Sequence, residues 1–309
     1  MRDEEYVELL KSTIGRSSGR APAMVRATLR ALSAAAPSVA VRVADRLFMT
    51  PPRHRAPARE VEALASARRR SLRIDGGAVA TWAWPAAGPA VVLVHGWGGR
   101  GGQLAAFVRP LLERNLAVVA FDAPGHGASG PGPATLPRLV AALRAVAGAH
   151  GPVHGIVAHS LGAIAAARAL HDGLPARCAV FVAPSATLTG PSARFADMLG
   201  FSASVRDRME RRIQERVGVA WSAFDVPRLA PHQVVPLLVV HDREDAEVPW
   251  QDGAAIARAW PGAALLQTGG LGHRRILRDP DVVSATVGFV ERHLDAPLAA
   301  ERPATAAAR

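Results

Sequence analysis

The fold of this chain is decided by one short stretch, Ala158-His159-Ser160-Leu161-Gly162. It follows an apolar run at 152–157 that predicts a β-strand, and it precedes an Ala-rich segment at 163–170 that predicts a helix. A sharp turn between a strand and a helix, with a serine at its centre, holds the hydroxyl strained and exposed at the head of the helix. The usual pattern is G-x-S-x-G, and Ala158 stands here in place of the first glycine. We therefore predict a nucleophilic serine at position 160.

Three more loops with reactive side chains follow predicted strands. The sequence H-G-W-G begins at His95 after the apolar run 90–94, and H-D-R-E-D-A-E-V-P begins at His241 after the run 236–240. His273 lies in a glycine-rich loop after the short run 263–267. The order serine, acid, histidine differs from that of chymotrypsin and subtilisin and is the order of the α/β-hydrolase triad. With the loop F-D-A-P-G-H-G-A-S at 121–129, these motifs make residues 71–294 resemble the α/β-hydrolase superfamily.

The resemblance implies an α/β fold with a mostly parallel central sheet, helices on both faces and one catalytic domain at 71–295. The regular alternation of predicted strands and helices points to the same architecture. Roughly fifty residues separate the strands predicted at 177–182 and 236–240, more than one crossover helix needs. We expect a small helical cap at about 184–235, where the family carries one, with packing on the main domain as the alternative. A helix is indicated there by apolar residues four apart and by a capping signature: Val205, Met209, Ile213, Val217; Ser204, Asp207.

The resemblance also assigns chemical roles to five residues. Ser160 is the expected nucleophile, and His273 is the expected base that takes its proton. Asp245 aligns with the acid of the family pattern H-G-x-x-D, whereas Asp242 replaces the glycine of that pattern and remains a rival. The expected oxyanion hole consists of the backbone N–H groups of Leu161 and Trp97.

These residues predict a serine hydrolase that needs no cofactor or metal and acts on a small-molecule substrate. Its substrates would be carboxylic esters, or thioesters, of small to medium apolar acyl groups, cleaved through an acyl-enzyme. Two alternatives remain open at this point: an amidase or peptidase with the same triad, and a hydrolase-like binding module without turnover.

The net charge of +11 is concentrated at the N-terminus. Residues 1–73 hold 15 Lys and Arg against 7 Asp and Glu, whereas the remainder holds 22 against 19. We expect a basic helical arm at 1–70, with two amphipathic helices on either side of Pro37, and no nucleic-acid binding by the nearly neutral main domain. The abundance of Arg and Ala favours compositional bias over the alternative, contact of the arm with a membrane or an acidic partner.

The remaining features concern the compartment. The single cysteine, Cys178, excludes a disulfide within the chain. The start of the chain lacks the apolar region of a secretory signal, and the longest uncharged run of 21–49 is too short to span a bilayer. We therefore expect a cytoplasmic protein, with a disordered tail at 296–309.

Overall fold

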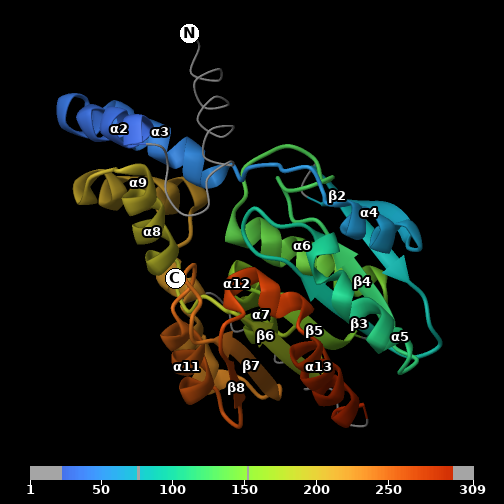
Figure 1. Ribbon diagram of the computed structural model, residues 1–309. Coiled ribbons are helices and arrows are strands. Elements are labelled where there is room, and N and C mark those ends of the chain that lie inside the picture. The colour runs from blue at the N-terminus through green and yellow to red at the C-terminus, as the bar shows by residue number, and fades with distance from the viewer. Residues whose placement is uncertain (1–22, 75–76, 152, 295–309) are drawn as a thin grey trace.

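The computed structural model describes residues 23–74, 77–151 and 153–294, so the predicted disorder of the tail lies outside the described residues. Within them, eight strands form one sheet (Figure 1). The strands are β1 (Arg68–Ile74), β2 (Gly77–Trp84), β3 (Ala90–Val94), β4 (Ala117–Phe121), β5 (Val153–His159), β6 (Cys178–Val182), β7 (Leu237–Asp242) and β8 (Ala264–Thr268). The predicted strands are all present, with ends that differ by a few residues.

The sheet is mostly parallel, as the sequence predicts. Its strand order is β1-β2-β4-β3-β5-β6-β7-β8; β2 pairs antiparallel with both β1 and β4, and the other pairs are parallel. Strands β3, β5, β6 and β7 are buried along their whole length, which is why β3 and β6 are continuous apolar runs rather than alternating ones. Strand β1 begins at Arg68, inside the predicted arm, because residues 68–70 already pair with β2.

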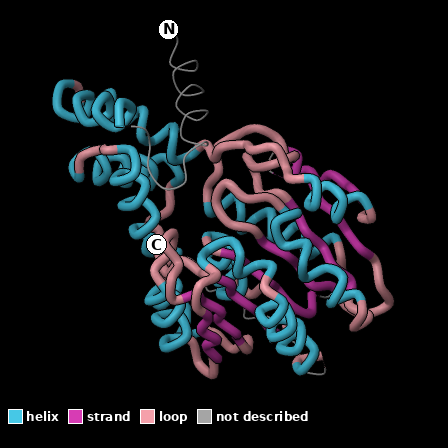
Figure 2. Tube along the Cα trace, in the orientation of Figure 1, coloured by secondary structure: helices cyan, strands magenta, loops and turns pink. Residues whose placement is uncertain are grey.

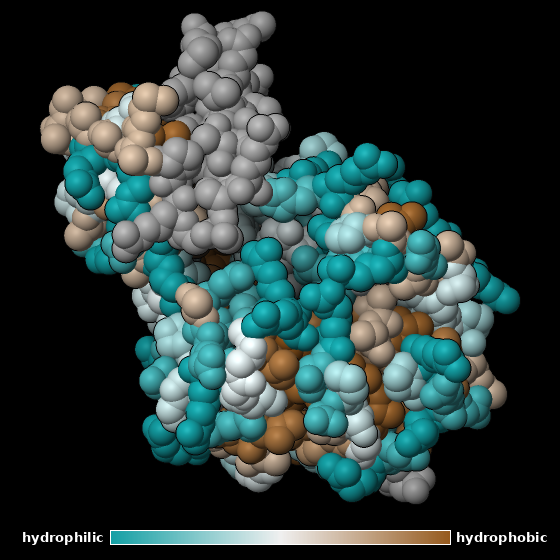
Figure 3. All heavy atoms as spheres, viewed as in Figure 1, coloured by the Kyte–Doolittle hydropathy of each residue, from teal (hydrophilic) through white to brown (hydrophobic). Residues whose placement is uncertain are grey.

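Helices cover both faces of the sheet (Figure 2). The sheet separates two hydrophobic clusters. Alternate residues of β3 enter opposite clusters, with Val92 and Val94 on one face and Val91 and Leu93 on the other. The first cluster contains side chains of α6 (Leu136–Ala149), α7 (Leu161–His171) and α11 (Trp250–Ala259). The second contains side chains of η1 (Gly101–Phe107), α5 (Val108–Leu112) and α13 (Pro280–Arg292). On the side seen in Figure 3 the described surface is mostly hydrophilic.

The helical segment after β3 is divided in two. It forms the 3-10 helix η1 followed by the short helix α5. Pro110 explains the break, because it has no N–H and an α-helix accepts proline only in its first turn. Helix α5 accordingly begins two residues earlier, at Val108. Helix α4 (Ala58–Ala65), which packs against η1, was not predicted.

Two groups of helices pack together beside the sheet (Figures 1 and 2). Helices α2 (Ala23–Ala35) and α3 (Pro37–Met49) precede the sheet and are separated near Pro37, as expected. They contact α8 (Thr189–Leu199) and α9 (Ala203–Val217), which lie between β6 and β7 in the residue range of the expected cap. The remaining short helices of that range are η2 (Trp221–Phe224), α10 (Val226–Leu229) and η3 (Ala230–His232).

The N-cap of α9 corrects a sequence prediction. Ser204 and Asp207 were expected to form the capping signature, but Ser204 lies inside the helix. The cap is Ser202, whose side-chain oxygen accepts a hydrogen bond of 3.3 Å from the backbone N–H of Val205. Both serines precede the same apolar stripe, so the pattern alone could not separate them.

Two short helices, α12 (Gly272–Arg275) and η4 (Ile276–Arg278), lie between β8 and α13. Helix α12 contains His273. Within residues 23–74, 77–151 and 153–294, no helix has the length and apolar character needed to cross a bilayer.

Candidate active site

Ser160 occupies a strained turn between β5 and α7. Its φ of 54° and ψ of −122° lie in a region that non-glycine residues rarely adopt. Gly162 permits the tight passage, because a Cβ there would lie 2.6 Å from the backbone oxygen of His95. Ala158 does not have positive φ, so replacing the first glycine of the motif costs no backbone strain. The local sequence thus produces the predicted elbow.

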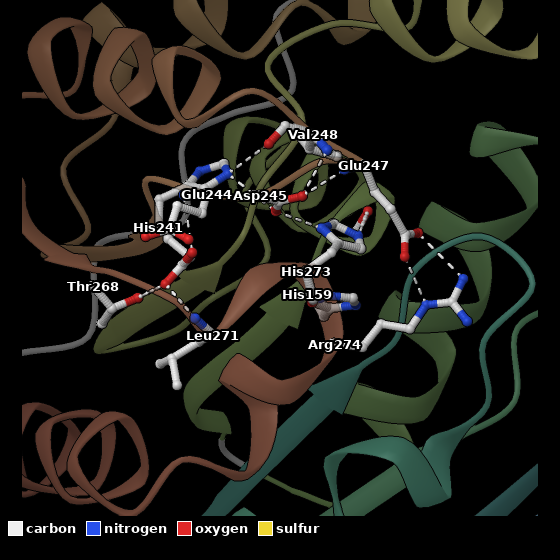
Figure 4. A network of polar contacts seen from close by, with 12 residues as sticks. His159, His241, Glu244, Asp245, Glu247, Val248, Thr268, Leu271, His273 and Arg274 are labelled. Carbon is white, nitrogen blue, oxygen red and sulfur yellow. Dashed lines mark hydrogen bonds and ion pairs between the residues drawn. The ribbon is translucent and has the colours of Figure 1, made fainter. Parts of the chain in front are cut away.

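Three side chains from distant parts of the chain meet at this turn. The Nε2 atom of His273 lies 3.0 Å from Ser160 Oγ, and its Nδ1 atom lies 2.7 Å from Asp245 Oδ2. All three residues are buried. Figure 4 shows the imidazole of His273 directed toward the carboxylate of Asp245. The hydrogen bonds form a continuous chain in which the imidazole can accept the serine proton while the carboxylate holds the opposite ring nitrogen.

The surroundings of Asp245 keep its carboxylate ionised. Burial opposes ionisation, but hydrogen bonds from His241, His273 and the backbone outweigh it and hold the Asp245 pKa well below its usual range. Oδ1 accepts hydrogen bonds from the N–H groups of Glu247 at 2.8 Å and Val248 at 2.9 Å. His241 Nε2 lies 3.4 Å from Oδ2. An ionised carboxylate is the form that stabilises an imidazolium.

Asp242, the rival acid, does not contact His273 in any recorded hydrogen bond. Its Oδ2 accepts hydrogen bonds from Thr268 Oγ1 at 2.7 Å and from the Leu271 N–H at 3.0 Å, and its Oδ1 accepts one from the Glu244 N–H at 3.0 Å. Although burial opposes it, these bonds hold the pKa of Asp242 below its usual range. Asp242 therefore ties the end of β7 to the loop that carries His273.

Gly96 brings the loop after β3 against Ser160. A Cβ at Gly96 would lie 2.8 Å from Ser160 Cβ, so only glycine permits this approach. The backbone N–H of Trp97 follows directly, and Leu161 is the first residue of α7, where N–H groups lack partners within the helix. Both predicted oxyanion donors therefore belong to segments that border Ser160.

A buried histidine stabilises this loop. His95 Nε2 accepts a hydrogen bond of 2.9 Å from the Ala123 N–H, and Nδ1 donates one of 2.7 Å to the Gly96 oxygen. Burial lowers the pKa of His95 to about 4, so the ring is neutral and keeps the proton on Nδ1. His95 therefore ties the loop after β3 to the loop after β4.

His159 reaches the loop that carries His273. Its Nε2 lies 3.0 Å from the backbone oxygen of His273, and the two rings are 4.6 Å apart between centroids. Burial, followed by the nearby His273, holds the pKa of His159 well below its ordinary value. A neutral His159 donates a hydrogen bond to the His273 loop. Only its place beside the nucleophile hinted at such a role.

No metal site accompanies these residues in the described part of the chain. No group of three or more His, Cys, Asp or Glu side chains there is arranged to hold an ion.

Comparisons with known proteins agree with this fold. The model of the alpha/beta hydrolase family matches residues 91–286, and the chain belongs to that family. A search of curated protein sequences finds no match.

Solved structures resemble the chain at low identity. An esterase from Pyrococcus furiosus is 19% identical with a TM-score of 0.61, covering 80% of this chain and 98% of its own. Est1E from Butyrivibrio proteoclasticus, solved with ferulic acid bound, is 18% identical with a TM-score of 0.58, covering 72% and 96%. A thioesterase domain from the curacin biosynthetic pathway is 15% identical with a TM-score of 0.54, covering 72% and 99%.

Proposed function

We propose that this chain is a serine hydrolase that cleaves carboxylic esters, or thioesters, of small to medium apolar acyl groups. The observation that carries the proposal is the hydrogen-bonded chain from Asp245 through His273 to Ser160. Ser160 is the nucleophile, His273 the general base and Asp245 the acid that orients the imidazole. Trp97 and Leu161 supply the oxyanion donors, and the reaction needs no cofactor.

Acylation begins with Ser160 Oγ attacking the substrate carbonyl carbon as its proton passes to His273 Nε2. The carbonyl oxygen becomes an oxyanion that the two backbone N–H groups stabilise. When the tetrahedral intermediate collapses, the bond to the alcohol or thiol breaks and His273 returns the proton to that leaving group. Asp245 stays ionised throughout, because its hydrogen bonds stabilise its charged form.

Deacylation repeats these steps with water. His273 takes a proton from the water as its oxygen attacks the acyl carbon, and the same donors stabilise the second oxyanion. Collapse releases the carboxylic acid and returns the proton to Ser160. A neutral imidazole is required at the start of both halves.

The comparisons supply the ground for naming esters and thioesters. The similar structures include an esterase and a thioesterase domain, and both kinds of substrate present a carbonyl with a good leaving group. At these identities the likeness establishes only the fold, so the substrate class is our proposal, drawn from the site together with these similar structures.

The test uses the purified chain on p-nitrophenyl esters of two to eight acyl carbons and on matching thioesters. Ser160→Ala and His273→Ala should each lose about a thousandfold or more in kcat. Ser33→Ala, which removes another buried serine, in α2, should keep wild-type activity and serves as the control.

Labelling of Ser160 with a fluorophosphonate distinguishes the alternatives. Rapid labelling without ester or thioester turnover, but with cleavage of p-nitroanilides, would favour an amidase. No labelling and no turnover would favour a binding module. Full ester activity in Ser160→Ala would refute the proposed mechanism.

A further inference from the structure

An aromatic cluster joins three separate segments beside the proposed nucleophile. The ring of Phe48, in the last turn of α3, is stacked on Trp97 with a centroid distance of 5.8 Å and an interplanar angle of 22°. On another side it is stacked on Trp221 at 5.9 Å and 27°, and its edge meets Phe195 of α8 at 5.2 Å. Phe48 therefore connects the loop after β3 to the residues inserted between β6 and β7.

Trp97 links this cluster to the reacting atoms. It follows Gly96, whose backbone lies against Ser160, and its side chain is 38% exposed. His126 supports the indole from one side with an edge-on contact of 5.6 Å. A large apolar surface next to a buried nucleophile gains free energy when an apolar group covers it.

Helix α3 is anchored on both sides of Phe48. Three residues earlier, buried Asp45 accepts hydrogen bonds of 2.6 and 2.7 Å from Arg216 and one of 3.0 Å from Arg212, both on α9. One residue later, the Met49 oxygen accepts a hydrogen bond of 2.9 Å from the Ala134 N–H. The helix that carries the Phe48 ring is thus held by polar contacts to two other parts of the fold, which favours a defined position of the ring.

Helix α3 also lies outside the segment that matches the family model, which begins at residue 91. The family's common core therefore does not account for Phe48. Packing alone explains why an apolar side chain stands there, but it does not explain a stack against an exposed tryptophan at the active site.

We propose that Phe48 is a specificity-determining residue whose ring, together with Trp97, bounds the region that receives the acyl group of the substrate. The inference rests on the proposed function. The ring occupies space between Trp97 and Trp221, so it limits how long an acyl chain can extend along Trp97. The preferred substrates are esters whose short or medium apolar acyl group ends against Phe48.

Removing the ring should lengthen the preferred acyl chain. Each additional methylene that becomes buried improves kcat/KM by about fourfold, so three methylenes amount to roughly fiftyfold. In Phe48→Ala we expect the kcat/KM ratio for p-nitrophenyl decanoate over butyrate to rise at least about tenfold above wild type. Phe48→Leu should give a smaller rise, and it covers the case in which the alanine variant does not fold. Phe48→Trp should lower the ratio.

Phe201→Ala is the matched control. Phe201 is a buried ring that stacks on Phe195 at 6.1 Å and has no recorded ring contact with Phe48 or Trp97. The Phe201→Ala variant loses the same kind of side chain from the same group of helices, and it should keep the wild-type ratio of kcat/KM for decanoate over butyrate. Thermal unfolding of each variant would show that the folded protein is being compared.

The outcomes separate this inference from the proposed function. An active wild type with an unchanged ratio in both Phe48→Ala and Phe48→Leu would overturn the inference alone. Equal losses on all chain lengths would do the same, because they would show that Phe48 only supports Trp97. An equal rise in the Phe201→Ala control would also overturn it. A wild type that cleaves none of these esters would overturn the proposed function and this inference with it.

Discussion

Asp242, the last residue of β7, and Asp245, in the loop that follows, should have different roles: Asp245 a catalytic one and Asp242 a structural one. In Asp245→Asn the side chain keeps its shape, but an amide NH₂ facing His273 Nδ1 favours the ring proton on Nε2. A protonated Nε2 cannot accept the Ser160 proton. The same exchange in a serine protease lowers kcat by about ten-thousandfold, or about 5.5 kcal/mol, and we expect a loss of that order here.

Asp242→Asn should mainly affect stability. An asparagine can direct its oxygen toward Thr268 and Leu271, which keeps those two bonds without their charge, but it then loses the bond from Glu244. A hydrogen bond to a charged group contributes about 1.5–3 kcal/mol and a neutral one about 1 kcal/mol. The sum over the three bonds is a loss of about 2.5–7 kcal/mol in the free energy of unfolding. Because the His273 loop is only loosened, kcat should fall by less than about thirtyfold.

The assay compares kcat on p-nitrophenyl butyrate with urea unfolding for both variants and wild type. Asp245→Asn should be folded and almost inactive, whereas Asp242→Asn should be less stable and mostly active. If Asp242→Asn instead kept its stability and lost as much kcat as Asp245→Asn, Asp242 would be the acid and the assignment above would be wrong.

Three further outcomes follow from single residues. Gly96→Ala should lower kcat by about a hundredfold or more, because its Cβ would lie 2.8 Å from Ser160 Cβ and displace an oxyanion donor. In the control Gly148→Ala the new Cβ has no atom near it, so this variant should keep wild-type kinetics. Equal kinetics in the two variants would contradict the prediction. The pKa of His95 is about 4 in the folded protein and 6.5 in the unfolded chain. Below pH 6.5 the unfolded chain therefore binds more protons at this residue than the folded protein does. The free energy of unfolding should therefore fall as the pH is lowered from 6.5 to 4, by up to about 3 kcal/mol from this residue, and urea titrations that stay flat over this range would exclude it. Burial raises the pKa of the Cys178 thiol to about 12, so Ellman's reagent should modify it only after unfolding, and rapid modification of the native protein would refute that.

The sequence predicted the sheet well because its strands are local signals. Runs such as 90–94 and 236–240 are apolar on both faces, and that pattern requires a buried parallel strand wherever it lies in the fold. Residues at strand ends, including Ser160 and His273, could be nominated because parallel strands bring their carboxyl ends to one edge. Local patterns failed at the N-cap of α9, where two neighbouring serines were equally plausible, whereas the proline at 110 itself marks where the helix must begin.

The sequence by itself determined the α/β class, the family and the chain order of the serine, the acid and the histidine. Only the tertiary structure shows which of the two aspartates is hydrogen-bonded to His273, that His159 reaches the His273 loop, and that Phe48 is stacked on Trp97. The physical reason is that propensity and periodicity act over a few residues, whereas these contacts join atoms 28 to 114 residues apart or lie between separate segments. Which of two neighbouring carboxylates faces an imidazole depends on how a loop bends and which N–H groups it satisfies, and that is fixed when the strands assemble.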